Sequence, residues 1–341
     1  MKRIGAWYLK ELKDIKKNNL NVFSTFHCGG GSSMGYKLAG CTVLGGVEID
    51  EKMMSIYRAN HNPKYSYKMA IQDFKKIPLK EIPEELKSLD ILDGSPPCSV
   101  FSTAGKRQKR WGKEFFFREG QELQRLDDLF IHFINIAEKL KPKIVIAENV
   151  KGLILGNAKG YVKEIFQEFN KAGYEVQLYL LNAAKMGVPQ SRERTFFIAR
   201  QKKLKLNNLN LEFNEPLVSF LDATKGLTKL KERKKLQPKL IPLWRKTLTG
   251  KALSSAHPKG FYFNTCKLNP NLPVPTITAG NYTHSLWNQP YYVTNEELIR
   301  LQTFPDDFDF LDQPIQYVTG MSVPPFMVQR LTLSLIKQWN L

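Results

Sequence analysis

The chain has 341 residues, and 51 Lys and Arg residues against 32 Asp and Glu residues give it a formal net charge of +19. Hydrophobic residues make up 42% of the chain and charged residues 24%, which excludes a mini-protein and a largely disordered chain. The length favours one large domain with a smaller one, and the positive charge favours a polyanionic partner such as nucleic acid.

No segment approaches the roughly 20 apolar residues that a membrane span requires, and the N-terminus lacks the hydrophobic run of a secretory signal. The four cysteines are far apart and form no C-x-x-C pair, which argues against a disulfide framework and a structural zinc site. We therefore expect a cytoplasmic protein without a membrane segment or a metal site.

In the first 200 residues, strand-like and helix-like segments alternate, which is typical of an α/β fold with a doubly wound parallel sheet. The expected strands are 22–26, 43–47, 91–92, 144–147, 175–181 and 195–199. The expected helices are 35–39, 51–60 and 127–140.

The pattern changes after residue 200, where the stretch 225–239 is densely basic and has no clear periodicity. We expect a large domain at 1–200, a smaller loop-rich domain at 201–290, and a C-terminal segment at 291–341 that returns to the large domain. Two further helices are expected at 295–301 and 325–339.

The turn FHCGGG at 26–31 joins a strand to a helix, where backbone N–H groups can approach a ligand closely. It lacks the G-x-G-x-x-G pattern, so a dinucleotide is disfavoured. Glu48 ends the next strand where a ribose-binding acid belongs, and Asp73 follows a possible third strand. Together they suit a nucleoside ligand without a pyrophosphate, although the glycines alone favour a plain tight turn.

Cys98 follows two prolines at the end of a strand, the edge of an α/β sheet where ligands bind. A thiol there is a candidate nucleophile if nearby positive charge lowers its pKa. The loop that follows is rich in Lys and Arg, although such a run is also typical of a solvated surface.

Two more segments place polar groups beside buried strands. Glu148, in the sequence ENV, ends an apolar strand, where a desolvated carboxyl could hold a proton. Gln190, Arg192 and Arg194 alternate along QSRER and would share one strand face, which alone is an ordinary pattern.

In this order, the motifs resemble those of the cytosine-C5 DNA methyltransferase family, of the bacterial or phage modification type, over nearly the whole chain. The family's F-x-G-x-G-G loop is similar to FHCGGG, and its P-P-C, E-N-V and Q-x-R-x-R motifs are matched at 96–98, 148–150 and 190–194. Its later motifs resemble PTIT at 275–278, LQTFPD at 301–306 and GMSVPP at 320–325.

The resemblance implies a Rossmann-like, S-adenosylmethionine-dependent sheet with catalytic and cofactor-binding functions in 1–200 and target recognition in 201–290. Cys98 would add to C6 of a flipped-out cytosine, with Glu148 at the N3 edge and Arg192 as a second stabiliser. We expect Glu48 to be charged in a solvated cleft and Glu148 to be neutral in a dry one. The implied cofactor-binding residues are Phe26, Gly30, Gly31, Glu48, Ile49, Asp73, Phe74, Pro96, Ser322 and Val323.

The implied partner is double-stranded DNA, and a cognate restriction endonuclease could accompany the enzyme functionally. The DNA-binding residues implied by the resemblance are Ser99, Ser102, Lys106, Arg107, Arg110, Asn149, Gln190 and Arg194. We expect a monomer. The alternatives are a tRNA methyltransferase of the same chemistry, a DNA-binding homologue without catalysis, and an oxidoreductase.

Three positions depart from the family pattern. Cys28 replaces a glycine of the cofactor loop, Ser99 replaces the glutamine that usually follows the nucleophile, and Met321 replaces an asparagine before V-P-P. None of these changes removes a catalytic group.

Overall fold

The computed structural model describes residues 6–97, 114–115, 124–125, 129–155, 159–227, 233–280 and 282–341. The chain divides into two compact units. The sheet unit comprises Ile15–Leu181, Glu193–Glu212 and Leu331–Leu341. The loop-rich unit comprises Met1–Asp14, Asn182–Arg192 and Phe213–Arg330.

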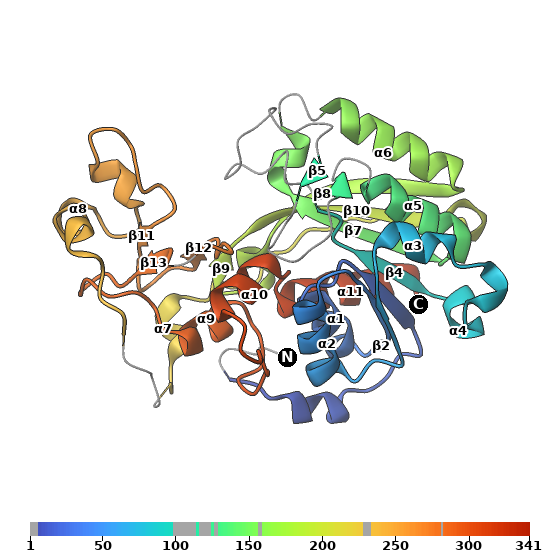
Figure 1. Cartoon of the computed structure of the whole chain (residues 1–341), viewed down its shortest axis with the longest axis horizontal. Coiled ribbons are helices and arrows are strands. Elements are labelled where there is room, and N and C mark those ends of the chain that lie inside the picture. Colours follow the sequence, from blue (N-terminus) through green and yellow to red (C-terminus); the bar gives the residue numbers. More distant parts are fainter. Residues whose placement is uncertain are drawn as a thin grey trace. The chain divides into compact units, whose positions relative to one another are not determined.

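A seven-stranded sheet with the order β3-β2-β1-β4-β7-β10-β8 forms the centre of the sheet unit (Figure 1). Neighbouring strands from β3 to β7 pair in parallel, whereas β10 is antiparallel to β7. The sheet is therefore mixed, whereas we expected a parallel sheet. The strands are β1 Asn21–Thr25, β2 Thr42–Glu48, β3 Tyr65–Lys68, β4 Ile91–Gly94, β7 Ile144–Val150, β8 Tyr174–Asn182 and β10 Glu193–Gln201.

Helices follow the strands, as in a doubly wound fold. Those of the sheet unit are α1 Gly31–Leu38, α2 Glu51–His61, α3 Ile71–Lys76, α4 Glu84–Lys87, α5 Leu129–Leu140 and α6 Lys159–Lys171, and α11 spans Pro325–Trp339. The expected strands and helices are all present within a few residues. Helix α6 was not among the expected elements, although Val162, Ile165, Phe166 and Phe169 have helical spacing.

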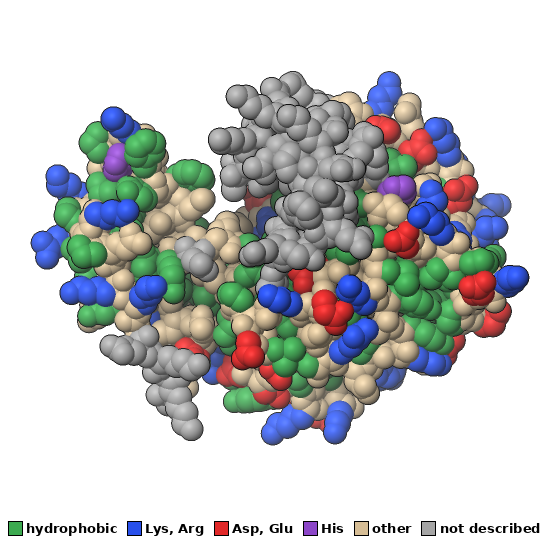
Figure 2. Space-filling view, in the orientation of Figure 1, with side chains coloured by type: hydrophobic (Ala, Val, Ile, Leu, Met, Phe, Trp, Pro, Cys, Tyr) green, Lys and Arg blue, Asp and Glu red, His purple; other side chains and the backbone are tan. Residues whose placement is uncertain are grey.

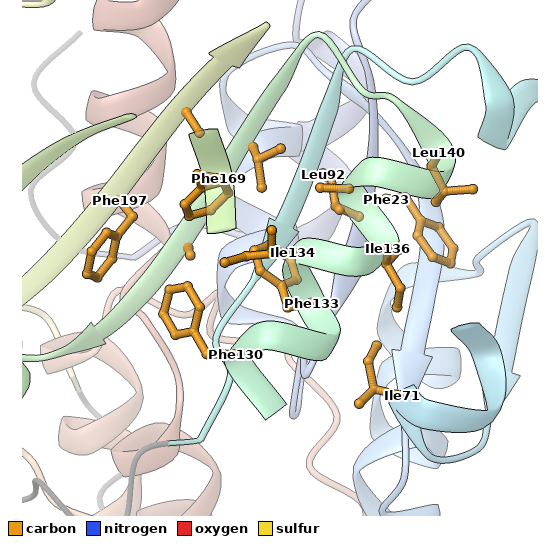
Figure 3. Close-up of a cluster of buried hydrophobic side chains, with 14 of the residues drawn as sticks. Phe23, Ile71, Leu92, Phe130, Phe133, Ile134, Ile136, Leu140, Phe169 and Phe197 are labelled. Atoms are coloured by element: carbon orange, nitrogen blue, oxygen red, sulfur yellow. The ribbon is translucent and has the colours of Figure 1, made fainter. Parts of the chain in front are cut away.

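Alternation along the central strands determines which residues face each layer. Phe23 of β1 pairs with Leu92 of β4, and both belong to the apolar core beneath α5. Phe130, Phe133 and Ile134 of α5 fill this core (Figure 3). Each fully buried side chain of this size contributes about 1.5–3 kcal/mol, so α5 and the sheet stabilise each other.

The loop-rich unit contains short elements. Its strands are β9 Gln190–Ser191, β11 Cys266–Lys267, β12 Val274–Pro275 and β13 His284–Ser285. Its helices are α7 Phe220–Thr224, α8 Ile241–Lys246, α9 Asn295–Leu301 and α10 Ile315–Met321. Two short strands of the sheet unit lie outside the seven-stranded sheet. They are β5 Glu114–Phe115 and β6 Gln124–Arg125, which pair antiparallel.

Short 3-10 helices connect several of these elements. They are η1 Leu9–Asp14, η2 Leu79–Glu81, η3 Lys151–Ile154, η5 Ala183–Met186, η6 Lys202–Leu204, η7 Pro238–Leu240 and η8 Leu253–Ala256. Within the part of the chain that the structure describes, no helix is both long enough and apolar enough to cross a bilayer.

Candidate active site

The carboxyl ends of the parallel strands β1, β2, β3, β4 and β7 meet at one edge of the sheet. In an open α/β sheet, ligands bind outside this edge. Phe26, Glu48 and Pro96 lie at or just beyond the ends of β1, β2 and β4, and Glu148 lies near the end of β7. The sheet topology therefore brings Phe26, Glu48, Pro96 and Glu148 to a common edge.

The turn after β1 is a tight one. The Gly30 N–H donates to the His27 carbonyl at 2.8 Å, and Gly30 has a φ of 91°. A Cβ at Gly30 would overlap the ring of His61, so a glycine is required there on both steric and conformational grounds. Cys28, which replaces the family glycine, also has a left-handed backbone, with a φ of 51°.

Glu48 is buried at the end of β2, and not in the solvated cleft that we expected. Its carboxylate accepts hydrogen bonds from the backbone N–H groups of Cys28 at 2.9 Å, Ile49 at 2.9 Å and Asp50 at 3.0 Å. Burial raises the pKa of Glu48, while these N–H groups oppose that rise. The carboxylate thus ties the glycine turn to the start of α2.

The other predicted cofactor residues of the sheet unit differ in exposure. Phe26 and Ile49 are partly exposed, and Asp73 is exposed and forms an ion pair with Lys76 at 2.8 Å. Phe74 is fully buried, and its ring stacks on Phe23 with a centroid distance of 5.6 Å. Its side chain therefore belongs to the core, which leaves its backbone for contact with a ligand.

Ser322 and Val323 lie in the loop-rich unit and are both buried. The Ser322 hydroxyl donates to the Val318 carbonyl at 2.7 Å, and the Ser322 carbonyl accepts from the Gln302 side chain at 2.7 Å. These contacts anchor the segment that follows α10.

Asp93 is a buried carboxylate that the motifs did not indicate. It accepts hydrogen bonds from the hydroxyl groups of Ser24 at 2.6 Å, Ser32 at 2.9 Å and Tyr36 at 3.0 Å. Burial raises the pKa of Asp93 to about 6, against the lowering effect of these three donors. Asp93 therefore joins β1 and α1 to the strand that leads to Cys98.

Glu148 forms an ion pair with Arg194, whose Nε lies 2.9 Å from its Oε1. The Asn149 side chain is buried and donates to the Pro96 carbonyl at 3.0 Å. Strand β7 thus holds both the predicted catalytic carboxylate and the segment that enters the P-P-C motif. Arg194, which we expected at DNA, lies at the carboxylate that we expected to be neutral.

Arg192 has a different environment, inside the loop-rich unit. Its guanidinium is buried and donates to the Ile277 carbonyl at 2.8 Å and the Gly320 carbonyl at 2.9 Å. The Gln190 side chain accepts from the Ile277 N–H at 2.9 Å and also bonds to Gln302. Three separate motifs therefore meet at Arg192 and Gln190, and these contacts hold the unit together.

Some predicted residues lie outside the described part of the chain: Cys98, Ser99, Ser102, Lys106, Arg107 and Arg110. Among the described residues, no group of three or more His, Cys, Asp or Glu side chains could hold a metal ion.

The mixed seven-stranded sheet, with a glycine turn, a strand-end acid and the Pro96–Pro97 segment at one edge, defines the class of Rossmann-like methyltransferases. The family model for C-5 cytosine-specific DNA methylases matches residues 20–337. The chain belongs to this family and is a DNA (cytosine-5-)-methyltransferase.

Two relatives illustrate the similarity. Type II methyltransferase M.FnuDI of Fusobacterium nucleatum is 32% identical over 236 residues, which cover 68% of this chain and 58% of that protein. Type II methyltransferase M.NgoPII of Neisseria gonorrhoeae is 26% identical over 355 residues, which cover 94% of this chain and 96% of that protein.

The fold is also similar to that of a prophage-encoded methyltransferase of E. coli. The two structures superpose with a TM-score of 0.72 at 20% identity, and the match covers 95% of this chain and 100% of the other. This similarity concerns the fold alone.

Proposed function

We propose that the enzyme transfers a methyl group from S-adenosylmethionine to C5 of a cytosine flipped out of a short, specific duplex sequence. We further propose that it belongs to a type II restriction-modification system. The names of two type II methyltransferases that match 94% and 97% of this chain support this. The observation that carries the proposal is the arrangement at the end of β7. Glu148 pairs there with Arg194, while Asn149 holds Pro96, two residues before Cys98.

In the proposed reaction, the Cys98 thiolate adds to C6 of the cytosine, which breaks the ring's aromaticity and makes C5 nucleophilic. S-adenosylmethionine, when bound, supplies an electrophilic methyl group on sulfur. Transfer to C5 would leave S-adenosylhomocysteine, a neutral thioether. Loss of the C5 proton to water would then restore the double bond and expel the Cys98 thiolate.

We assign Glu148 to the N3 edge of the base, where its carboxyl group would offset the charge that develops in the ring. The ion pair with Arg194 fixes the orientation of the Glu148 carboxyl group. Arg194 is therefore our candidate for the residue that positions Glu148. Arg192, bonded to two carbonyls, is our candidate for a structural anchor in the loop-rich unit.

The residues at the ends of β1, β2 and β3 fit the proposed cofactor. Phe26 and Ile49 offer partly exposed apolar surface for an adenine ring, and Glu48 and Asp73 offer carboxylates for hydroxyl and amino groups. Gly30 and Gly31 keep side chains out of the turn. Glu48 would bind ribose hydroxyls with the lone pairs that its three N–H partners leave available.

A cytosine inside a duplex cannot present C6 to a thiol, so the base must leave the stack at a cost of a few kcal/mol. We propose that the basic loop after Cys98, with Ser99, Ser102, Lys106, Arg107 and Arg110, contacts the flipped strand. We propose residues 201–290 as the part that reads the target sequence. Phosphate contacts from the basic stretch 225–239 would make binding weaken steeply with salt.

The test is expression in a methylation-free host, followed by genome-wide mapping of 5-methylcytosine. A consensus sequence around the modified cytosines is expected, whereas methylation of tRNA alone would contradict the DNA assignment. A duplex carrying 5-fluorocytosine at the mapped position should trap a covalent complex with the wild type. Cys98→Ala should bind the duplex without forming this complex or any product.

A further inference from the structure

We propose that Phe261 and Phe263 form an aromatic wedge that contacts a base step of the target duplex and contributes to sequence discrimination. The proposal rests on the proposed function, because it concerns how the same enzyme recognises its DNA. The wedge lies on the loop 257–263, within the loop-rich unit.

Both phenylalanines are unusually exposed. Phe261 and Phe263 are each 58% exposed, whereas the intervening Tyr262 is partly buried and packs on a small apolar cluster. This cluster contains Leu236, Leu240, Trp244, Leu253 and Tyr292. Tyr262 thus anchors the loop, and the phenylalanines that flank it in the sequence are left exposed. Two large exposed apolar groups on one short loop suggest a contact surface.

Hydrogen bonds within the loop 257–263 and at its base fix the loop conformation. The His257 Nδ1 accepts hydrogen bonds from the backbone N–H groups of Lys259 at 3.1 Å and Phe261 at 3.3 Å. The Gly260 N–H donates to the His257 carbonyl at 2.9 Å, and Gly260 has a φ of 67°. The base of the loop is closed by the Leu253 N–H, which donates to the Thr265 carbonyl at 2.8 Å. A preorganised loop loses little entropy when its rings bind a partner.

The charge around the loop identifies the partner as a polyanion. Between Asp222 and Glu296 the sequence contains twelve Lys and Arg residues and one acid, Glu232. Lys246, Lys251 and Lys259 are exposed. Around α8, hydrophobic side chains lie among Lys and Arg side chains on the visible surface (Figure 2). Lys and Arg side chains can bind the phosphates of a duplex. The phenyl rings of Phe261 and Phe263 require an apolar or aromatic surface, which a duplex offers in its bases.

The decisive variant is Phe261→Ala/Phe263→Ala, compared with Lys251→Ala/Lys259→Ala. Binding would be measured by fluorescence anisotropy at several salt concentrations, with duplexes that contain or lack the mapped site. We expect the phenylalanine variant to bind the target duplex about 10- to 100-fold more weakly, with a smaller loss for the duplex that lacks the site. The slope of log affinity against log salt concentration should not change. The lysine variant should weaken both duplexes alike and reduce the slope by about 1 per lysine.

Leu79→Ala is the matched control, because Leu79 is 49% exposed and belongs to the sheet unit. It should change neither affinity nor discrimination. His257 is a positioning residue in this scheme. We expect His257→Ala to weaken target binding in the same direction as the phenylalanine variant, and His257→Asn to restore part of it, because an amide oxygen can accept the loop N–H groups.

Phe261→Gln/Phe263→Gln serves as a second variant if the alanine variant lowers the melting temperature. The inference is overturned if both double variants keep the wild-type ratio of target to non-target affinity. It is also overturned if they change self-association and leave DNA binding intact. If the wild type methylates DNA and the phenylalanine variants bind target and non-target duplexes as the wild type does, only the wedge proposal is refuted. If the wild type forms no 5-methylcytosine, the proposed function is refuted.

Discussion

Arg194 and Glu148 form an ion pair across the antiparallel strands β7 and β10, with Nε 2.9 Å from Oε1. Phe196 lies directly opposite Glu148, so Arg194 reaches the carboxylate diagonally from two residues away. The two side chains are 13% and 12% exposed, which makes the pair largely desolvated. Such pairs are costly to break on one side, since the remaining charge loses its partner.

Arg194→Met should lower kcat by about 10²- to 10³-fold, on the scale of a general acid–base contribution, because the Glu148 carboxyl group loses the partner that orients it. It should also destabilise the fold by about 3 kcal/mol, since Glu148 is left uncompensated. Steady-state methyl transfer and urea unfolding measure the two effects. Lys151→Met is the control, because the Lys151–Glu193 pair at 2.8 Å is about 40% exposed and contributes less than about 1 kcal/mol. A wild-type kcat in Arg194→Met would refute the assignment.

Gly320→Ala should destabilise the loop-rich unit by about 2–4 kcal/mol, because a Cβ there would overlap the backbone of Thr278 and Ala279. It would also displace the carbonyl that accepts from Arg192. Gly160→Ala is the matched control in another helix, where an added Cβ would meet no atom within 4 Å and alanine should be neutral or stabilising. Thermal unfolding distinguishes the two, and equal melting temperatures would contradict the close approach at Gly320.

Cys28→Gly should stabilise the protein by about 0.5–1 kcal/mol, because glycine adopts the left-handed backbone of residue 28 without strain. Part of the gain is lost to the greater freedom of glycine in the unfolded chain. Cys28→Ala removes the sulfur but keeps the Cβ, so it should show no such gain. If urea unfolding gives both variants the same increase, the effect comes from the thiol and not from the backbone.

Asp93→Asn should change how stability depends on pH. The pKa of Asp93 is about 6 in the folded protein, above its ordinary value of about 3.9, so the folded state binds the proton more tightly. The contribution of Asp93 is therefore most favourable at low pH and falls as the pH rises from about 4 to about 6. A shift of this size corresponds to about 3 kcal/mol.

The asparagine variant lacks this titration, so the difference in unfolding free energy between wild type and variant should fall across that window and level off above it. His27 and His284, whose pKa values burial lowers to about 4, produce the opposite slope but are present in both proteins and cancel in the difference. Urea titrations from pH 4.5 to pH 7.5 measure this, and a difference that does not vary with pH would contradict the raised pKa.

Much of the sheet unit could be predicted because its elements have short-range patterns. The apolar run 144–147 and the helical spacing of 129–140 are visible within a dozen residues, and each appears in the structure as β7 and α5. The direction of β10 was not predictable in this way. An apolar strand has the same pattern in either direction, and its orientation depends on the connection before it and on the strand it pairs with.

The candidate site was also predictable only where the sequence has short-range motifs. The order and types of the motif residues were visible in the sequence, and the family they indicated is confirmed. Asp93 was missed because its three hydroxyl partners are spread over residues 24–36, with no recognisable spacing. Alternation predicted one strand face for Gln190, Arg192 and Arg194, and this was wrong. The structure divides the segment between β9 and β10 at Arg192, which gives Arg192 and Arg194 different environments.

By itself, the amino-acid sequence determined the class of chemistry. The thiol of Cys98, the carboxyl group of Glu148 and the glycines at 29–31 are part of the covalent chain before it folds. Tertiary structure alone decided the environments of the charged groups: Glu48 buried among backbone N–H groups, Glu148 bound to Arg194, and Arg192 bonded to carbonyls. The physical reason is that burial and hydrogen bonding depend on atoms brought together from distant parts of the chain. These contacts set the orientation and solvent exposure of each group, which residue type and spacing do not encode.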